Sequence, residues 1–245
     1  MDLKGKTILV TGGRRVGQVV ADELGGVGAH IVMTYRKSRT EIAQAVDHLA
    51  EIHRIRAQAY ALDLTDEGSI RTLVKDVTKD FGGIDGLVNM ASLFEPDPKE
   101  VTASHIQKAF AVSTGSMLLS RWFAEEAKRR TAVNAPIVSF IDWAVDHPYA
   151  GYDLYLAGKA ALRHYLMALQ TTFAGTVRIV NIHPGMILEP PNFPPAEKQE
   201  IVENTPTKSM GDPQQAATLV RTALELDFLA ADIPLDGGQH WRHRL

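Results

Sequence analysis

This chain of 245 residues is constrained first by what it lacks. It contains no cysteine, which excludes a disulfide framework and any metal site built on thiolates. No apolar run reaches the ~18 residues of a membrane-spanning helix, so we expect no membrane partner. A net charge of −3 gives no broad basic surface for a nucleic acid. No two of the nine histidines lie four residues apart on an expected helix, so we expect no metal.

The remaining composition is typical of a soluble globular protein. Hydrophobic residues make up 45% of the chain and charged residues 22%, which allows a sizeable core. The amino-terminal residues Met1–Lys6 lack the apolar stretch of a signal peptide. We therefore expect a cytoplasmic protein.

Strand-like and helix-like segments alternate along the chain. This alternation predicts right-handed crossovers and an α/β fold. We expect residues 1–245 to form one Rossmann-type domain, a doubly wound parallel sheet of about seven strands with helices on both faces. Apolar runs typical of buried strands are Thr7–Val10, His30–Thr34, Ala57–Leu62, Gly86–Asn89, Pro136–Ile141, Val177–Ile182 and Ile233–Leu235. Helical patterns cover Val16 to about Leu24, Thr40–Ile52, Glu67–Phe81, His105–Arg130, Asp153–Phe173 and Pro213–Leu226.

A glycine-rich turn follows the first expected strand. The run Thr11–Gly17 contains Gly12, Gly13 and Gly17 and leads into a helical pattern. A strand, a glycine turn and a helix amino terminus together suit the pyrophosphate of a dinucleotide. The alternative is a turn that only connects the two elements.

The end of the second expected strand indicates which dinucleotide is bound. An enzyme that uses NAD usually carries an acid here for the ribose 2′-hydroxyl. This chain instead has Tyr35, Arg36, Lys37 and Ser38, which suit a 2′-phosphate, with Arg14 or Arg15 able to reach it from the first turn. NADPH is favoured, although a solvated basic loop is the alternative.

Three polar residues indicate proton-transfer chemistry. Tyr155 and Lys159 are spaced one helical turn apart, and Asp142 lies thirteen residues before Tyr155. A cation beside a phenol favours the phenolate, so Lys159 is expected to lower the pKa of Tyr155 from its usual ~10.

The segment Leu188–Pro213 differs from the rest of the chain in composition. It carries six of the twelve prolines and follows the sixth expected strand, at the edge where open α/β sheets bind ligands. We expect a long irregular segment that acts as a lid over the substrate. A decorated loop is the alternative.

Together these motifs resemble the short-chain dehydrogenase/reductase family over essentially the whole chain. The resemblance implies a catalytic Tyr155 and Lys159, and a cofactor site that includes Asn89 and Ala91. It also extends to motifs in family order: Asp63-Leu64, Asn89-Met90-Ala91-Ser92, His183-Pro184-Gly185 and Leu235-Asp236-Gly237-Gly238.

Within that family, several residues resemble those of pteridine reductases, including bacterial dihydromonapterin reductases. Asp142 stands where most members have a serine, and Ser92 replaces a usual glycine. Phe94 lies where those enzymes stack an aromatic ring on the pterin. Each residue also has a structural explanation: a turn residue, a neutral replacement and a packed loop aromatic.

Three departures from the family pattern bear on function. The glycine turn between Gly12 and Gly17 is one residue short, which puts cofactor affinity in doubt. Ser113 replaces the asparagine that normally holds a water of the proton relay. Met90 replaces the second asparagine of its motif, and nothing in the sequence explains that change.

The resemblance implies an NADPH-dependent reductase that takes a dihydropterin to its tetrahydro form. Asp142 is expected to bond Tyr155 or a donor on the substrate, which suits a protonated Asp142 or a proton-donating Tyr155. A carbonyl or 3-ketoacyl reductase is the alternative within the family, and an NADPH-binding sensor without catalysis is the alternative outside enzymes. A homotetramer is implied, with Trp241 and Leu245 apolar enough for a subunit contact.

Overall fold

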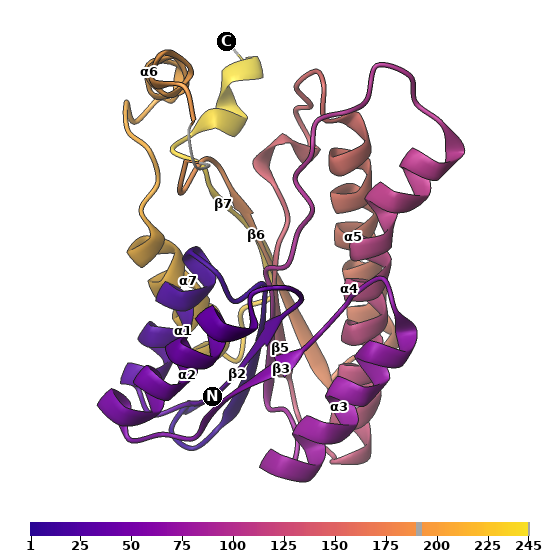
Figure 1. The fold of residues 1–245 in the computed structure, drawn as a ribbon, viewed down its shortest axis with the longest axis vertical. Helices are drawn as coiled ribbons and strands as arrows, with labels where there is room; N and C mark the ends of the chain where they lie inside the picture. Colours follow the sequence, from indigo (N-terminus) through magenta and orange to yellow (C-terminus); the bar gives the residue numbers. More distant parts are fainter. Residues whose placement is uncertain (190–192, 245) are drawn as a thin grey trace.

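The computed structural model describes residues 1–189 and 193–244, and it contains the expected parallel sheet. Seven strands pair in the order β3-β2-β1-β4-β5-β6-β7, all in parallel register (Figure 1). The strands are β1 (Thr7–Thr11), β2 (His30–Tyr35), β3 (Ala57–Ala61), β4 (Gly86–Asn89), β5 (Ala135–Phe140), β6 (Val177–Pro184) and β7 (Ala231–Leu235). The α-helices are α1 (Val16–Gly26), α2 (Arg39–His53), α3 (Glu67–Phe81), α4 (Ala103–Arg129), α5 (Asp153–Thr172), α6 (Pro195–Asn204) and α7 (Pro213–Glu225), and the 3-10 helices are η1 (Trp143–Val145) and η2 (Gln239–Arg244).

Helices cover both faces of the sheet, as the alternation predicted. Helices α1, α2 and α7 lie on one face, and α3, α4 and α5 lie on the other (Figure 1). The strands are apolar on both sides because each face is buried: Ile8 and Val10 of β1 join one core cluster, and Leu9 joins the other. The strand order therefore puts the carboxyl ends of β1 and β4 at the centre of the molecule, where the topology reverses.

Two glycines allow backbone segments to approach closely beside that reversal. A Cβ on Gly12 would lie 2.7 Å from the amide nitrogen of Ala91, and one on Gly115 of α4 would lie 1.9 Å from the Leu64 carbonyl oxygen. Any larger residue would force β1 away from β4, or α4 away from the end of β3.

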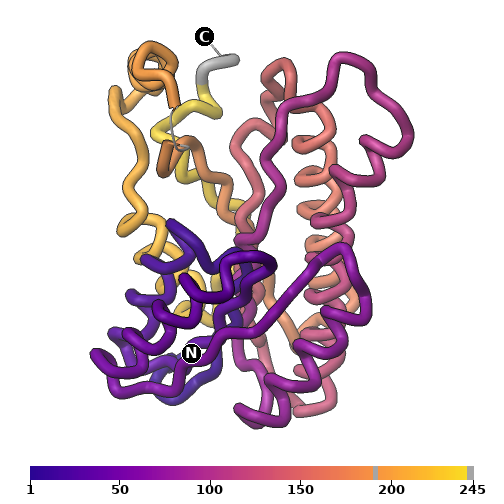
Figure 2. Tube along the Cα trace, viewed as in Figure 1, coloured from indigo at the N-terminus to yellow at the C-terminus, as the bar shows by residue number. Residues whose placement is uncertain are grey.

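The segment after β6 differs from the expected irregular chain. It contains α6, which begins at Pro195, in keeping with the preference for proline in the first turn of a helix. Helix α6 and the carboxyl-terminal η2 both lie beyond the carboxyl ends of the strands (Figure 2), and Gln239 of η2 donates a hydrogen bond to Thr205. Residues 190–192 of the expected lid, and Leu245 of the expected subunit contact, lie outside the described residues.

Among the helices that the structure describes, none has the length and apolar character needed to cross a bilayer.

Candidate active site

A cavity of about 1010 Å³ opens at the carboxyl ends of the central strands. It runs from the glycine turn to α6 and η2. The residues expected to bind the cofactor and those expected to carry the chemistry therefore line the same cavity. Every site residue named from the sequence lines it except Asn89: Gly12, Arg14, Arg15, Gly17, Tyr35, Arg36, Lys37, Ser38, Asp63, Leu64, Ala91, Ser92, Phe94, Asp142, Tyr155, Lys159, Pro184 and Gly185.

Asn89 supports the site from beneath instead of lining it. Its side-chain amide is buried and donates to Ser120 at 2.9 Å and Ser139 at 3.2 Å. These bonds connect β4 with α4 and β5, and a role for Asn89 in the cofactor site stays a prediction.

The glycine turn lines one end of the cavity and is tightly packed. Gly12 has a φ of 72°, and a Cβ on Gly17 would lie 2.4 Å from the Gly12 carbonyl oxygen. The hydroxyl of Thr11 accepts hydrogen bonds from the amides of Met90 (3.1 Å) and Ala91 (3.2 Å), which fixes the turn to the end of β4. The shortened turn is therefore compact and has no side chain at its two narrowest points.

Cationic side chains border the glycine turn. Arg36 and Lys37 are exposed, and neither has an ion-pair partner among the described residues. Arg14 pairs with Glu41 at 2.9 Å, and Arg15 donates to the backbone carbonyl of Glu189. The free positive charge at this end therefore belongs to Arg36 and Lys37.

Asp63 and Leu64 line the same cavity just after the end of β3. The carboxylate of Asp63 accepts hydrogen bonds from the hydroxyl and the amide of Thr65, at 2.7 and 2.9 Å. These bonds, with a smaller contribution from Arg36, lower the pKa of Asp63, so it is ionised at neutral pH.

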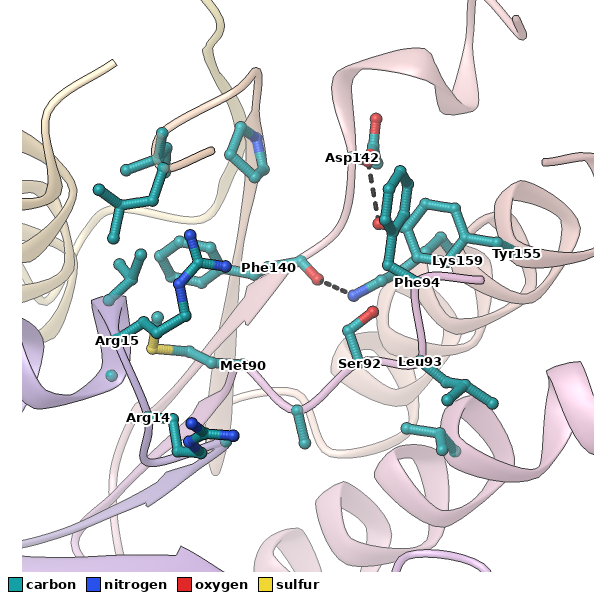
Figure 3. Close-up of a pocket in the computed structure, with 18 of the residues that line it drawn as sticks. Arg14, Arg15, Met90, Ser92, Leu93, Phe94, Phe140, Asp142, Tyr155 and Lys159 are labelled. Atoms are coloured by element: carbon teal, nitrogen blue, oxygen red, sulfur yellow. Dashed lines mark hydrogen bonds between the residues drawn. The ribbon is translucent and has the colours of Figure 1, made fainter. Parts of the chain in front are cut away.

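The other end of the cavity brings together the three polar residues expected to carry chemistry (Figure 3). The phenol of Tyr155 donates to Asp142 Oδ2 at 2.9 Å, and Asp142 Oδ1 accepts from the Ala144 amide at 2.9 Å. Lys159 Nζ is buried and donates to the Phe140 carbonyl at 2.6 Å. The β5 strand positions Asp142, and one face of α5 positions Tyr155 and Lys159.

The pKa of Tyr155 is shifted in the direction opposite to the one expected from its spacing with Lys159. Burial, together with the neighbouring Asp142 carboxylate, raises the pKa of Tyr155 well above its usual value. Lys159 was expected to lower it, but its Nζ lies 5.9 Å from the centre of the Tyr155 ring and bonds Phe140 instead. The expected lowering of the Tyr155 pKa is therefore not found, and the raised pKa favours the protonated phenol.

Asp142 and Lys159 are shifted toward their neutral forms. Burial raises the pKa of Asp142, although hydrogen bonds from Ala144 and Tyr155 partly oppose the shift. Burial lowers the pKa of Lys159 to about 8. These shifts favour a protonated phenol at Tyr155, a residue that lines the cavity.

Aromatic rings form one wall of the substrate end. Phe94 is 49% exposed, stacks on Tyr152 with ring centres 4.4 Å apart, and meets Tyr155 edge-on at 5.0 Å. Tyr149 continues the wall, 5.6 Å from Tyr152. Phe94 is thus placed as expected, but the sequence analysis missed Tyr149 and Tyr152, although an aromatic-rich stretch just before Tyr155 was a usable signal.

The far wall of the substrate end comes from segments that the sequence analysis treated as lid and tail. Helix α6 contributes Glu197, Glu200 and Ile201, and η2 contributes Gln239. Spacing gave no signal for these residues, because their approach depends on how the chain returns over the sheet.

Comparison with known proteins identifies the family. Residues 6–200 match the family described as short chain dehydrogenase. The chain belongs to that family. As a short-chain dehydrogenase it is an oxidoreductase with a Rossmann-type fold, which confirms the resemblance drawn from the motifs.

Solved and curated relatives of this short-chain dehydrogenase carry different names. FolM Alternative dihydrofolate reductase 1 from Brucella suis, solved in complex with NADP, is 26% identical, with a TM-score of 0.88 over 98% of this chain and 96% of that one. A short chain dehydrogenase from Burkholderia cenocepacia J2315, also solved with NADP, is 28% identical, with a TM-score of 0.86 over 98% and 99%. The 2,5-dichloro-2,5-cyclohexadiene-1,4-diol dehydrogenase LinX of Sphingobium indicum is 29% identical over 96% of each chain. The family therefore leaves the substrate open.

Proposed function

We propose that this short-chain dehydrogenase is an NADPH-dependent reductase that takes a dihydropterin-like ring to its tetrahydro form. The observation that carries the proposal is the hydrogen bond between Tyr155 and Asp142, in a wall of aromatic rings. FolM Alternative dihydrofolate reductase 1, a relative of matching fold, is named for a pterin-containing substrate.

The glycine-turn end of the cavity fits NADPH. The turn between β1 and α1 lines the cavity at Gly12 and Gly17, and the backbone amides at a helix amino terminus suit a pyrophosphate. Arg36 and Lys37 supply free cations for a 2′-phosphate, and a guanidinium suits that group better than a neutral donor. When bound, NADPH supplies a hydride. The residues that we assign to it are Gly12, Arg14, Arg15, Gly17, Tyr35, Arg36, Lys37, Ser38, Asp63, Leu64, Ala91, Tyr155, Lys159, Pro184 and Gly185.

The protonated Tyr155 suits reduction of a ring C=N bond. Such a bond gains a hydride at carbon and a proton at nitrogen, and Tyr155 is the proton donor in our proposal. Asp142 holds the phenol by accepting its hydrogen bond at 2.9 Å, and burial together with Asp142 raises the pKa of Tyr155. Lys159 orients a hydroxyl of the cofactor ribose, because its buried ammonium has N–H groups to spare beyond the bond to Phe140.

The substrate subsite that we propose consists of Ser92, Phe94, Asp142 and Tyr155. A flat heterocycle can lie against the exposed ring of Phe94, which Tyr152 supports by stacking. An ionised Asp142 would repel the oxyanion that develops on a ketone, so ketone chemistry fits this site less well.

We also propose a cytoplasmic homotetramer. Exposed apolar side chains that support self-association are Leu226, Phe228 and Trp241, the last of them 60% exposed. Light scattering on the purified protein tests this proposal, and a monomer at micromolar concentration would contradict it.

The experiment that tests the function is NADPH oxidation with a panel of substrates. The panel contains a dihydropterin, an acetoacetyl thioester and an aromatic ketone, each assayed with NADPH and with NADH. We expect turnover of the dihydropterin with NADPH. Turnover of the ketone or the thioester alone would contradict the proposal.

A further inference from the structure

We propose that Arg163, Asp232 and His183 form a positioning system that holds Asp142 against Tyr155. This inference rests on the proposed function, in which Asp142 acts through Tyr155. None of the three lines the described cavity, so they cannot touch a substrate there. They affect the site through their contacts with the two ends of the short helix η1.

The position of η1 has to be set by contacts with other elements. It has three residues, Trp143–Val145, between Asp142 at its amino end and Asp146 at its carboxyl end. A helix this short has too few internal hydrogen bonds to be stable alone. The Asp142 carboxylate and the Trp143 ring, which both line the cavity, are therefore only as well placed as the contacts around η1.

His183 holds the amino end of η1. It is 5% exposed at the carboxyl end of β6, and its Nδ1 lies 3.2 Å from the Asp142 carbonyl oxygen. Because a carbonyl only accepts, Nδ1 carries the proton in this contact. The other ring nitrogen, Nε2, lies 3.5 Å from Asp232 Oδ1 and makes no hydrogen bond to the described residues, so Asp232 faces this side of the ring without bonding it.

Asp232 is the anion behind that histidine. It lies on β7, at the edge of the sheet, and accepts from Asn181 at 2.8 Å and from Arg163 Nε and Nη2 at 2.9 and 2.6 Å. Partial burial acts to raise the pKa of Asp232, but the bonds from Arg163 and Asn181 outweigh it and lower the pKa. Asp232 is therefore ionised at neutral pH.

Arg163 holds the carboxyl end of η1. Its Nη1 contacts the two carboxylate oxygens of Asp146 at 3.0 and 3.3 Å, while its other two nitrogens bind Asp232. Only a planar guanidinium can serve both carboxylates in this way.

The spacing on α5 explains why this arrangement bears on chemistry. Tyr155, Lys159 and Arg163 follow one another at intervals of four residues and share one face of the helix. Tyr155 bonds Asp142 before η1, and Arg163 bonds Asp146 after it. Helix α5 is therefore hydrogen-bonded to both ends of η1. Loosening the Arg163 end should disturb the Tyr155–Asp142 geometry without changing any group in the cavity.

The test is a double-mutant cycle between Arg163→Lys and Asp142→Ala, assayed with the best substrate of the panel. Lysine keeps the charge but cannot bridge both carboxylates, so we expect kcat to fall about tenfold, with KM for NADPH nearly unchanged. In the Asp142→Ala background the same change should cost less than about twofold, because the residue being positioned is gone. Arg71→Lys is the matched control, since it disturbs an exposed helical ion pair with Glu67 far from the cavity.

A second measurement is independent of turnover. The indole ¹H–¹⁵N resonance of Trp143, assigned by its loss in Trp143→Phe, should shift in Arg163→Lys and stay in place in Arg71→Lys. An equal loss of kcat in both backgrounds, or an unmoved Trp143 resonance, would overturn the inference. Turnover of a ketone alone would contradict the dihydropterin proposal yet still allow the cycle to be measured. If no substrate turns over, the Trp143 resonance alone decides.

Discussion

The phenol of Tyr155 donates a 2.9 Å hydrogen bond to Asp142 in a buried part of the cavity. Burial and the neighbouring carboxylate raise the pKa of the phenol, whereas the cation expected to lower it bonds the backbone of Phe140. In our proposal this protonated tyrosine gives its proton to the ring nitrogen during the reduction.

Removing the Tyr155 hydroxyl should abolish turnover and spare cofactor binding. For Tyr155→Phe we expect kcat to fall by about 10²–10⁴, the usual contribution of a positioned general acid. The dissociation constant for NADPH, measured by fluorescence titration, should change less than about threefold. Tyr152→Phe is the matched control because it keeps the ring that stacks on Phe94. Equal losses in the two variants would argue against proton donation by Tyr155.

Arg36 and Lys37 should determine the choice between NADPH and NADH. With both changed to alanine, we expect the dissociation constant for NADPH to rise about 10- to 100-fold, since charge-assisted hydrogen bonds to a phosphate are lost. Binding of NADH, which has no 2′-phosphate, should hardly change. Arg39→Ala is the control, as Arg39 is exposed nearby but does not line the cavity. Calorimetry on the double variant, the Arg39→Ala control and the unsubstituted protein checks the prediction, and parallel losses for both cofactors would refute it.

Lys159 should make the free energy of unfolding rise with pH in the alkaline range. Burial lowers its pKa from 10.5 to about 8, so between these values the unfolded chain binds a proton that the folded chain lacks. Stability therefore rises with pH across this window, and the penalty for the buried charge is full below pH about 8. Lys159→Met should be more stable than the unsubstituted protein at pH 7, and the difference should shrink toward pH 10. Urea denaturation at several pH values measures this; a difference that grows with pH would have the wrong sign.

The carboxylates at the α6 side of the cavity should disfavour substrates with an anionic tail. Glu197 and Glu200 line the cavity, are exposed and have no ion-pair partner among the described residues. Changing both to lysine should raise kcat/KM for dihydrofolate, relative to a dihydropterin without a carboxylate, by about 3- to 10-fold at low salt. The gain should vanish in high salt. Glu203→Lys is the control, because Glu203 is on the same helix but away from the cavity; an equal gain there would exclude a local effect.

The sequence predicted the sheet well because buried parallel strands are continuous apolar runs, which remain visible without any tertiary information. Helix α6 was missed for the opposite reason. It has no buried residue and lies in a proline-rich stretch, so no apolar periodicity marks it.

The sequence predicted which residues lie together in the cavity better than it predicted their pKa shifts and hydrogen-bond partners. Motif order brought Tyr155, Lys159 and Asp142 together correctly. The direction of the Tyr155 pKa shift depends on burial and on where the Lys159 ammonium points, and neither can be inferred from a four-residue spacing. The partners of η1 lie on β6, β7 and α5, so only the folded chain shows them.

The most direct test of the central claim is the ratio of kcat/KM for a dihydropterin to that for an aromatic ketone, in the unsubstituted protein and in Asp142→Ser. If Asp142 sets Tyr155 as a proton donor to a ring nitrogen, the ratio should favour the dihydropterin and fall by at least about tenfold in the variant. An unchanged ratio, or a ketone preference in the unsubstituted protein, would contradict the account.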